Sequence, residues 1–201
     1  MLFLFCEPKV ERTFVFIDSA YLSEIAKHLL ETRYPHYDLN KFALNLTKEQ
    51  NLSCSGIFYY TAPPYQSSQP STKEKRKKAK YDKFISRLRS IANFIVREGR
   101  CQKTDDGYQQ KGVDTLLTMD LMDVCARENV KKIILIACDT DFVPILNKIR
   151  EDYSVEFVLY YFTDRVRRSK FSMSNHILTA CDRCILITKQ RFIQCLLKKR
   201  E

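Results

Sequence analysis

Two stretches of similar design decide the fold: Thr13-Phe-Val-Phe-Ile17, which ends at Asp18, and Lys132-Ile-Ile-Leu-Ile-Ala-Cys138, which ends at Asp139. Both are runs of β-branched and aromatic or aliphatic residues, and each predicts a buried strand with a carboxylate at its carboxyl end. Further strands are expected on the same grounds at residues 56–60, 94–97, 155–161 and 184–187.

Helical patterns lie between these runs. Residues 84–93, 114–127 and 142–150 carry apolar side chains at helical spacing. The alternation of strands and helices, without tight hairpin turns, favours an α/β fold with a mainly parallel central sheet flanked by helices. We expect a single domain over residues 1–201, with a basic helical segment at about 73–93 and a C-terminal helix at about 189–200.

Composition narrows the class of protein. With 45% hydrophobic and 29% charged residues, the chain is neither disordered nor fibrous. Its 34 Lys and Arg against 24 Asp and Glu give a net charge of +10, which favours an anionic partner. The opening apolar run, residues 1–6, is shorter than the ~20 residues that span a bilayer. Eight cysteines are too few for a disulfide scaffold. We therefore expect a cytoplasmic protein with reduced thiols and no membrane partner.

Acidic side chains follow both deciding strands. Asp18 ends the first, Asp139 and Asp141 follow the second, and Asp114 stands at a helix start directly after Lys111-Gly-Val. Ligands of open α/β sheets bind outside the carboxyl ends of the strands. A cluster of like charges is costly unless cations neutralise it, and oxygen-only ligands select Mg²⁺ or Mn²⁺. The pattern therefore indicates a metal site.

The alternative interpretation is that each of these acids is a helix cap or a first-turn acid. Asp120 is a weaker candidate, because it lies about 240° round the helix from Asp114 and could only flank the site.

Five short motifs occur in a specific order along nearly the whole chain. They are Phe16-Ile-Asp-Ser-Ala-Tyr-Leu22, Phe58-Tyr-Tyr-Thr-Ala-Pro-Pro64, Gly99-Arg-Cys-Gln102, Lys111-Gly-Val-Asp114 and Ala137-Cys-Asp-Thr-Asp-Phe-Val-Pro144. Their order and spacing resemble the NYN domains of the LabA-like group, which is related to the PIN-like nucleases. The resemblance implies a Rossmann-like PIN-type fold and hydrolysis of RNA phosphodiester bonds at an Mg²⁺ or Mn²⁺ centre. It also implies that the catalytic, metal-holding carboxylates are Asp18, Asp114, Asp139 and Asp141.

Basic side chains suit RNA phosphates. We expect single-stranded RNA to contact Lys111 and two basic groups, although a charge run by itself is typical of a solvated helix face. The two groups are Lys75, Arg76, Lys77 and Lys78, and Arg165, Arg167 and Arg168. Tyr60, Tyr65 and Tyr108 are candidates for stacking on bases, against the alternative of ordinary partial burial. The sequence leaves a homodimer as an alternative to a monomer.

The function favoured by these observations is a metal-dependent ribonuclease. The alternative is a catalytically inactive RNA-binding or scaffolding module with the same fold. It is favoured by Ser19-Ala20-Tyr21, which stands where the family pattern usually runs through Gly to Asn. A phosphohydrolase of the haloacid dehalogenase type is disfavoured, because it needs a second acid at the position of Ala20.

Overall fold

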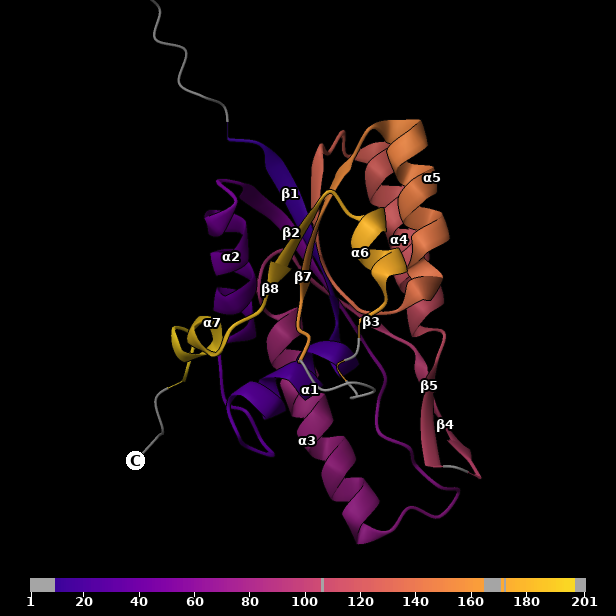
Figure 1. Cartoon of the computed structure of the whole chain (residues 1–201). Coiled ribbons are helices and arrows are strands. Elements are labelled where there is room, and N and C mark those ends of the chain that lie inside the picture. Colours follow the sequence, from indigo (N-terminus) through magenta and orange to yellow (C-terminus); the bar gives the residue numbers. More distant parts are fainter. Residues whose placement is uncertain (1–9, 106, 165–170, 172, 198–201) are drawn as a thin grey trace, which may run out of the picture.

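The central feature is a parallel sheet (Figure 1). The computed structural model describes residues 10–105, 107–164, 171 and 173–197, and within them six parallel strands form one sheet in the order β3-β2-β1-β6-β7-β8. The strands are β1 (Arg12–Asp18), β2 (Ser53–Thr61), β3 (Phe94–Glu98), β6 (Lys132–Ile136), β7 (Glu156–Tyr161) and β8 (Arg183–Leu186). The expected α/β class is confirmed, and each of the predicted strands is present.

Helices cover both faces of this sheet (Figure 1). One face packs against α1 (Ser19–Leu29), α2 (Leu39–Glu49), α3 (Thr72–Arg89) and α7 (Lys189–Ile193), and the other against α4 (Val113–Arg127), α5 (Val143–Tyr153) and α6 (Asn175–Ala180). The central strand β1 alternates between the two cores. Val15 and Ile17 enter the first, whereas Phe14 and Phe16 enter the second. Burial on both faces explains why its sequence is a continuous apolar run.

Three elements differ from the expectations. The basic helix α3 ends at Arg89 rather than near Asn93, because Asn93 takes a left-handed conformation (φ 61°) immediately before β3. Helix α7 ends at Ile193, and the expected remainder is a turn followed by an isolated bridge between Leu196 and Tyr37, with residues 198–201 outside the described part. A polar hairpin, β4 (Arg100–Thr104) with β5 (Gly107–Lys111), was not expected, because it lacks apolar alternation.

The sequence predicts reduced cysteines and no membrane-spanning segment, and the structure bears on both over the residues it describes. Over the described ranges, the cysteines are free thiols, seven in number. No helix in that part combines the length and apolar character needed to cross a bilayer.

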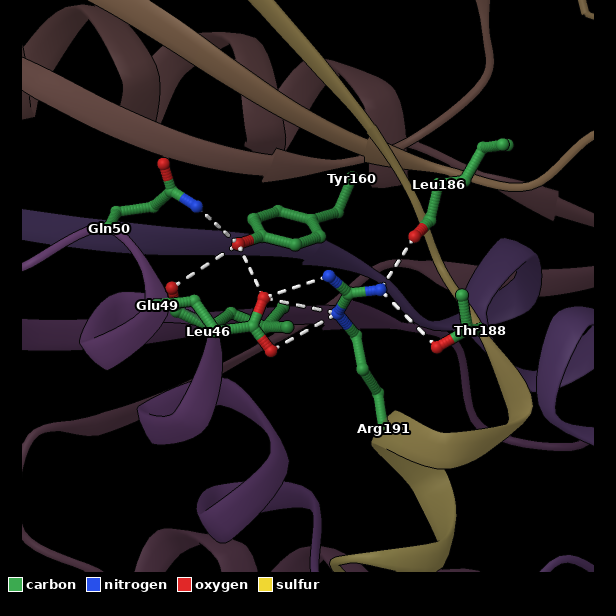
Figure 2. A network of polar contacts seen from close by, with 7 residues as sticks. All are labelled: Leu46, Glu49, Gln50, Tyr160, Leu186, Thr188 and Arg191. Atoms are coloured by element: carbon green, nitrogen blue, oxygen red, sulfur yellow. Dashed lines mark hydrogen bonds and ion pairs between the residues drawn. The ribbon is translucent and has the colours of Figure 1, made fainter.

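A polar network fastens α7 to the sheet (Figure 2). The Arg191 guanidinium donates to both carboxylate oxygens of Glu49 in α2, at 2.9–3.2 Å, and to the carbonyl oxygen of Leu186 at 2.7 Å. The buried Tyr160 hydroxyl accepts from Gln50 Nε2 at 2.8 Å. Arg191 therefore joins α7 to α2 and to the end of β8.

A second ion pair joins the sheet to α4. Arg97 of β3 donates through Nε and Nη2 to the two carboxylate oxygens of Asp120, at 2.7 and 2.8 Å, and the Tyr60 hydroxyl donates to the same carboxylate at 3.0 Å. The Asp120 side chain is only 8% exposed. Bidentate charge-assisted bonds are the strong kind. Asp120 is therefore a structural residue of the sheet–helix contact, and Arg97 does not extend a basic surface.

Replacing Asp120 by Asn should destabilise the fold by about 2 kcal/mol, because the amide leaves Arg97 without its counter-charge and places a donor against the guanidinium. The matched control is Asp123→Asn, three residues further along α4. Its pair with Arg127 is exposed, and its loss should cost under about 0.5 kcal/mol. Urea denaturation of both variants measures the difference. Equal effects would contradict the structural role of Asp120.

Candidate functional site

The site lies where the strand order of the sheet reverses. β1 and β6 are neighbours, and the chain continues from β1 to β2 and β3 on one side but from β6 to β7 and β8 on the other. The register pairs Ile17 with Ile136, so Asp18 and the segment leading to Asp139 leave the sheet at the same edge. Such a switch point is where open α/β sheets bind ligands.

Asp18 and Asp139 are both helix caps. Asp18 Oδ1 accepts the backbone N–H groups of Ala20 at 2.9 Å and Tyr21 at 3.3 Å, at the start of α1. Asp139 Oδ1 accepts the N–H of Asp141 at 2.9 Å and caps the short helix η1 (Thr140–Phe142). In the described part of the chain, no donor reaches the Oδ2 atom of either carboxylate. The caps therefore hold each carboxylate in place through one oxygen and leave the other available.

Asp114 reaches the site through a tight turn. Gly112 adopts φ 80°, a left-handed conformation, and α4 begins directly after it with Asp114 in its first turn. The chain also approaches itself closely here, because a Cβ on Gly99 would lie 2.5 Å from the Lys111 carbonyl oxygen. Gly99 therefore lets the hairpin base pass close to the start of α4, and Gly112 allows the left-handed turn.

The carboxylates act on one another electrostatically. Burial raises the pKa of Asp18 to about 6, the Tyr21 and Ala20 N–H groups oppose the rise, and the nearby charges of Asp114 and Asp139 add to it. The pKa of Asp114 is raised first by burial and then by the charges of Asp139 and Asp141. The charges of these four acids therefore act on one another in pairs, and Asp18, Asp114, Asp139 and Asp141 are here called the carboxylate cluster.

Cys138, the residue before Asp139, is a neutral thiol in the folded chain. Burial raises the pKa of its thiol to about 12, and the charges of Asp18, Asp139 and Asp114 contribute. The cluster thus offers carboxylate oxygens and no thiolate, a donor set that suits a hard divalent cation. As the side chains stand, no three acidic, His or Cys residues in the described ranges form a ready metal-binding group. Asp114, Asp139 and Asp141 are exposed side chains.

The predicted RNA contacts divide into several groups. Lys111 ends β5 beside the start of α4, and Lys75, Arg76 and Lys77 are exposed on α3. Lys78 forms an ion pair with Asp82 on the same helix. The remaining expected contacts, Arg165, Arg167 and Arg168, lie outside the described residues.

The tyrosine candidates also differ from one another. Tyr60 cannot stack on a base, because it is fully buried against α4. Tyr108 is 64% exposed, and its ring lies 5.4 Å from that of Tyr65. Sequence reasoning missed Tyr34 and Lys27, which line a cavity beside α1. For Tyr34, the adjacent Arg33 in the loop after α1 is the one sequence signal, and Lys27 within α1 has none.

Comparison with known proteins identifies the family. The sequence model of the NYN domain matches residues 12–188. The fold also resembles a crystal structure of a protein of unknown function from Vibrio parahaemolyticus RIMD 2210633, with a TM-score of 0.60 and 19% identity over 94% of this chain and 97% of that chain. That likeness shows the fold alone, and the comparison with curated proteins gives no match. Because the family match runs from the start of β1 to the end of β8, the chain belongs to the NYN domain family, a family of PIN-like nucleases.

Proposed function

We propose that this chain is a metal-dependent ribonuclease that hydrolyses phosphodiester bonds of single-stranded RNA. The observation that supports the proposal is the parallel pairing of β1 with β6, which directs Asp18 and the segment leading to Asp139 to the same edge of the sheet. Asp114 and Asp139 are near enough for their charges to act on Asp18, and Asp139 and Asp141 act on Asp114. These carboxylates come from three separate segments of the chain. Membership of a nuclease family agrees with a phosphodiester substrate.

The four carboxylates would hold Mg²⁺ or Mn²⁺. An ion there would supply charge neutralisation for the phosphate and activation of the attacking water. The hydrogen bonds to Oδ1 restrict rotation of the Asp18 and Asp139 side chains and so orient their second carboxylate oxygens. Lys111 lies three residues before Asp114 and is suited to neutralise a neighbouring phosphate. These residues position a substrate and need no covalent intermediate.

A catalytically inactive RNA-binding module is the second candidate. The observation in its favour concerns Tyr21 of the segment Ser19-Ala20-Tyr21, which stands where the family pattern usually runs through Gly to Asn. Its hydroxyl accepts from the Phe162 N–H at 2.9 Å and donates to the Phe162 carbonyl oxygen at 3.2 Å. A hydroxyl engaged with the backbone does not orient a water at the carboxylates.

The purified protein should cleave labelled single-stranded RNA when Mn²⁺ or Mg²⁺ is present, because the carboxylate cluster needs a cation to accept a phosphate. Gel analysis of the products, with and without EDTA, measures this. Cleavage that continues in EDTA would contradict the metal role. Binding without cleavage under either ion would identify the inactive module.

The variant Asp139→Asn should lower cleavage by about a hundredfold or more, the scale of losing one electrostatic stabiliser. The amide oxygen can still accept the Asp141 N–H, so the fold is retained. The matched control is Asp38→Asn, the same change at the cap of α2, where Oδ1 accepts the Lys41 N–H at 2.9 Å. Wild-type turnover in Asp139→Asn would show that Asp139 is a cap only.

Asp18→Asn should raise the thermal midpoint of the metal-free protein at pH 7.5 by about 2–4 °C, equivalent to about 1 kcal/mol. The pKa of Asp18 rises from 3.8 to about 6 on folding, so the folded carboxyl binds a proton between these values and the unfolded one does not. Wild-type stability therefore falls as the pH rises from 3.8 to about 6. The advantage of Asp18→Asn should shrink towards pH 4.5.

Thermal scans in EDTA across this pH range measure the effect. Added Mn²⁺ should then stabilise the wild type more than Asp18→Asn, since a ligand stabilises the state that binds it. A variant that is less stable than the wild type at pH 7.5 would show that Asp18 carries no buried-charge penalty.

A further inference from the structure

Two adjoining cavities open along α1 and α3, with volumes of about 630 and 740 Å³. They share lining residues from α1, α3, β2 and the loop after α1, which makes them one continuous depression, here named the α1–α3 groove. The shared residues are Ser19, Ser23, Lys27, Tyr34, Tyr59 and Lys77. Figure 1 shows α1, α3 and the β4–β5 hairpin at the same end of the molecule.

One part of the α1–α3 groove lies beside the carboxylate cluster. Ser19 and Ala20 line it, and they follow Asp18 directly, with the Ala20 N–H donating to the Asp18 carboxylate. Gln110, the residue before Lys111, lines the same part. The four carboxylates themselves line neither cavity. The groove therefore starts next to the candidate metal centre and leads away from it.

Positive charge dominates the groove. Among the described residues, Lys77, Lys80 and Arg33 have no acidic partner. Glu24 is the sole acid along its lining in that part of the chain, and its carboxylate pairs with Lys27 at 2.6 Å. Four cations against one paired carboxylate make an environment suited to a row of phosphates.

Aromatic side chains lie between these cations. Tyr34 is 74% exposed, and the Arg33 guanidinium lies 5.7 Å from the centre of its ring. Tyr59 and Phe84 line the groove as well, with their ring centroids 6.2 Å apart. Exposed aromatic rings within a basic groove are typical of single-stranded nucleic-acid sites, where unpaired bases stack.

We infer that the α1–α3 groove binds the single-stranded RNA segment that flanks the scissile bond, with phosphates on Lys77 and Lys80 and an unpaired base on Tyr34. The inference rests on the proposed function for the identity of the strand. It also reduces the number of RNA contacts that the sequence predicts on α3. Of Lys75, Arg76, Lys77 and Lys78, only Lys77 lines the groove.

The helical positions explain this selection. Lys77, Lys80, Tyr81 and Phe84 follow the spacing of one helix face, and all four line the groove. Lys75 is about 160° away from Lys77 round α3. An acidic peptide would also meet the cations, but it offers no bases for Tyr34. RNA therefore accounts for both the charge and the aromatic ring.

Fluorescence anisotropy of labelled oligo-uridine RNA in EDTA tests the groove independently of cleavage. Each lost phosphate contact should reduce the slope of log K against log salt by about 0.7. The double variant Lys77→Ala/Lys80→Ala should therefore reduce that slope by about 1.4. Tyr34→Ala should weaken binding about tenfold, and Tyr34→Phe should retain it, because the ring does the stacking.

The matched control is Lys48→Ala/Lys83→Ala, which removes the same charge from exposed positions of α2 and α3 that line neither cavity. It should alter the slope by much less. Equal slopes for the two double variants would overturn the inference that the α1–α3 groove binds RNA. Stronger competition by poly-glutamate than by unlabelled RNA would also overturn it and identify an acidic protein ligand.

The two proposals can fail separately. If the protein cleaves RNA under Mn²⁺ and the groove variants bind RNA as the wild type does, RNA binding by the groove is overturned and the ribonuclease activity is supported. If the groove variants bind RNA more weakly but the protein cleaves none under either ion, RNA binding by the groove is supported and the ribonuclease activity is overturned. Absence of RNA binding by the wild type would overturn the groove.

Discussion

The parallel pairing of β1 with β6 is the constraint on which the rest of the structure depends. It places two strands that are distant in sequence side by side at the centre of the sheet, where both faces are buried. It also makes both strands end at one edge, each followed by an aspartate. Burial raises the pKa of Asp18 and of Asp114, and the charges of neighbouring acids add to the rise. Burial of apolar residues on both faces stabilises the sheet enough to carry this local cost.

A cap and a ligand are compatible roles for one carboxylate. Asp18 and Asp139 each use Oδ1 to satisfy backbone N–H groups at a helix start, which orients the side chain. The second oxygen remains for a cation. The observed capping is therefore compatible with the proposed metal site, because capping restricts the carboxylate that such a site would need to be held in place.

Formal charge overstates the positive surface that is available to a ligand. Arg97 is committed to Asp120 between the sheet and α4, and Arg191 is committed to Glu49 at α7. Arg89 is likewise paired, with Glu98. The cations that line the α1–α3 groove stand out because Lys77 and Lys80 have no such partner among the described residues. Tertiary pairing separates structural cations from those that can meet phosphates.

The sequence by itself determined the α/β class and the strands, because buried parallel strands are continuous apolar runs. It also predicted the four acids as a site. It could not determine the β4–β5 hairpin, whose polar residues lack periodicity. Nor could it reveal that Tyr60 is buried against Asp120, since the two residues are 60 positions apart in the sequence. Only the tertiary structure decided the strand order, the carboxylate cluster and the α1–α3 groove. These features depend on which segments pack together, and packing joins residues whose separation along the chain carries no local signal.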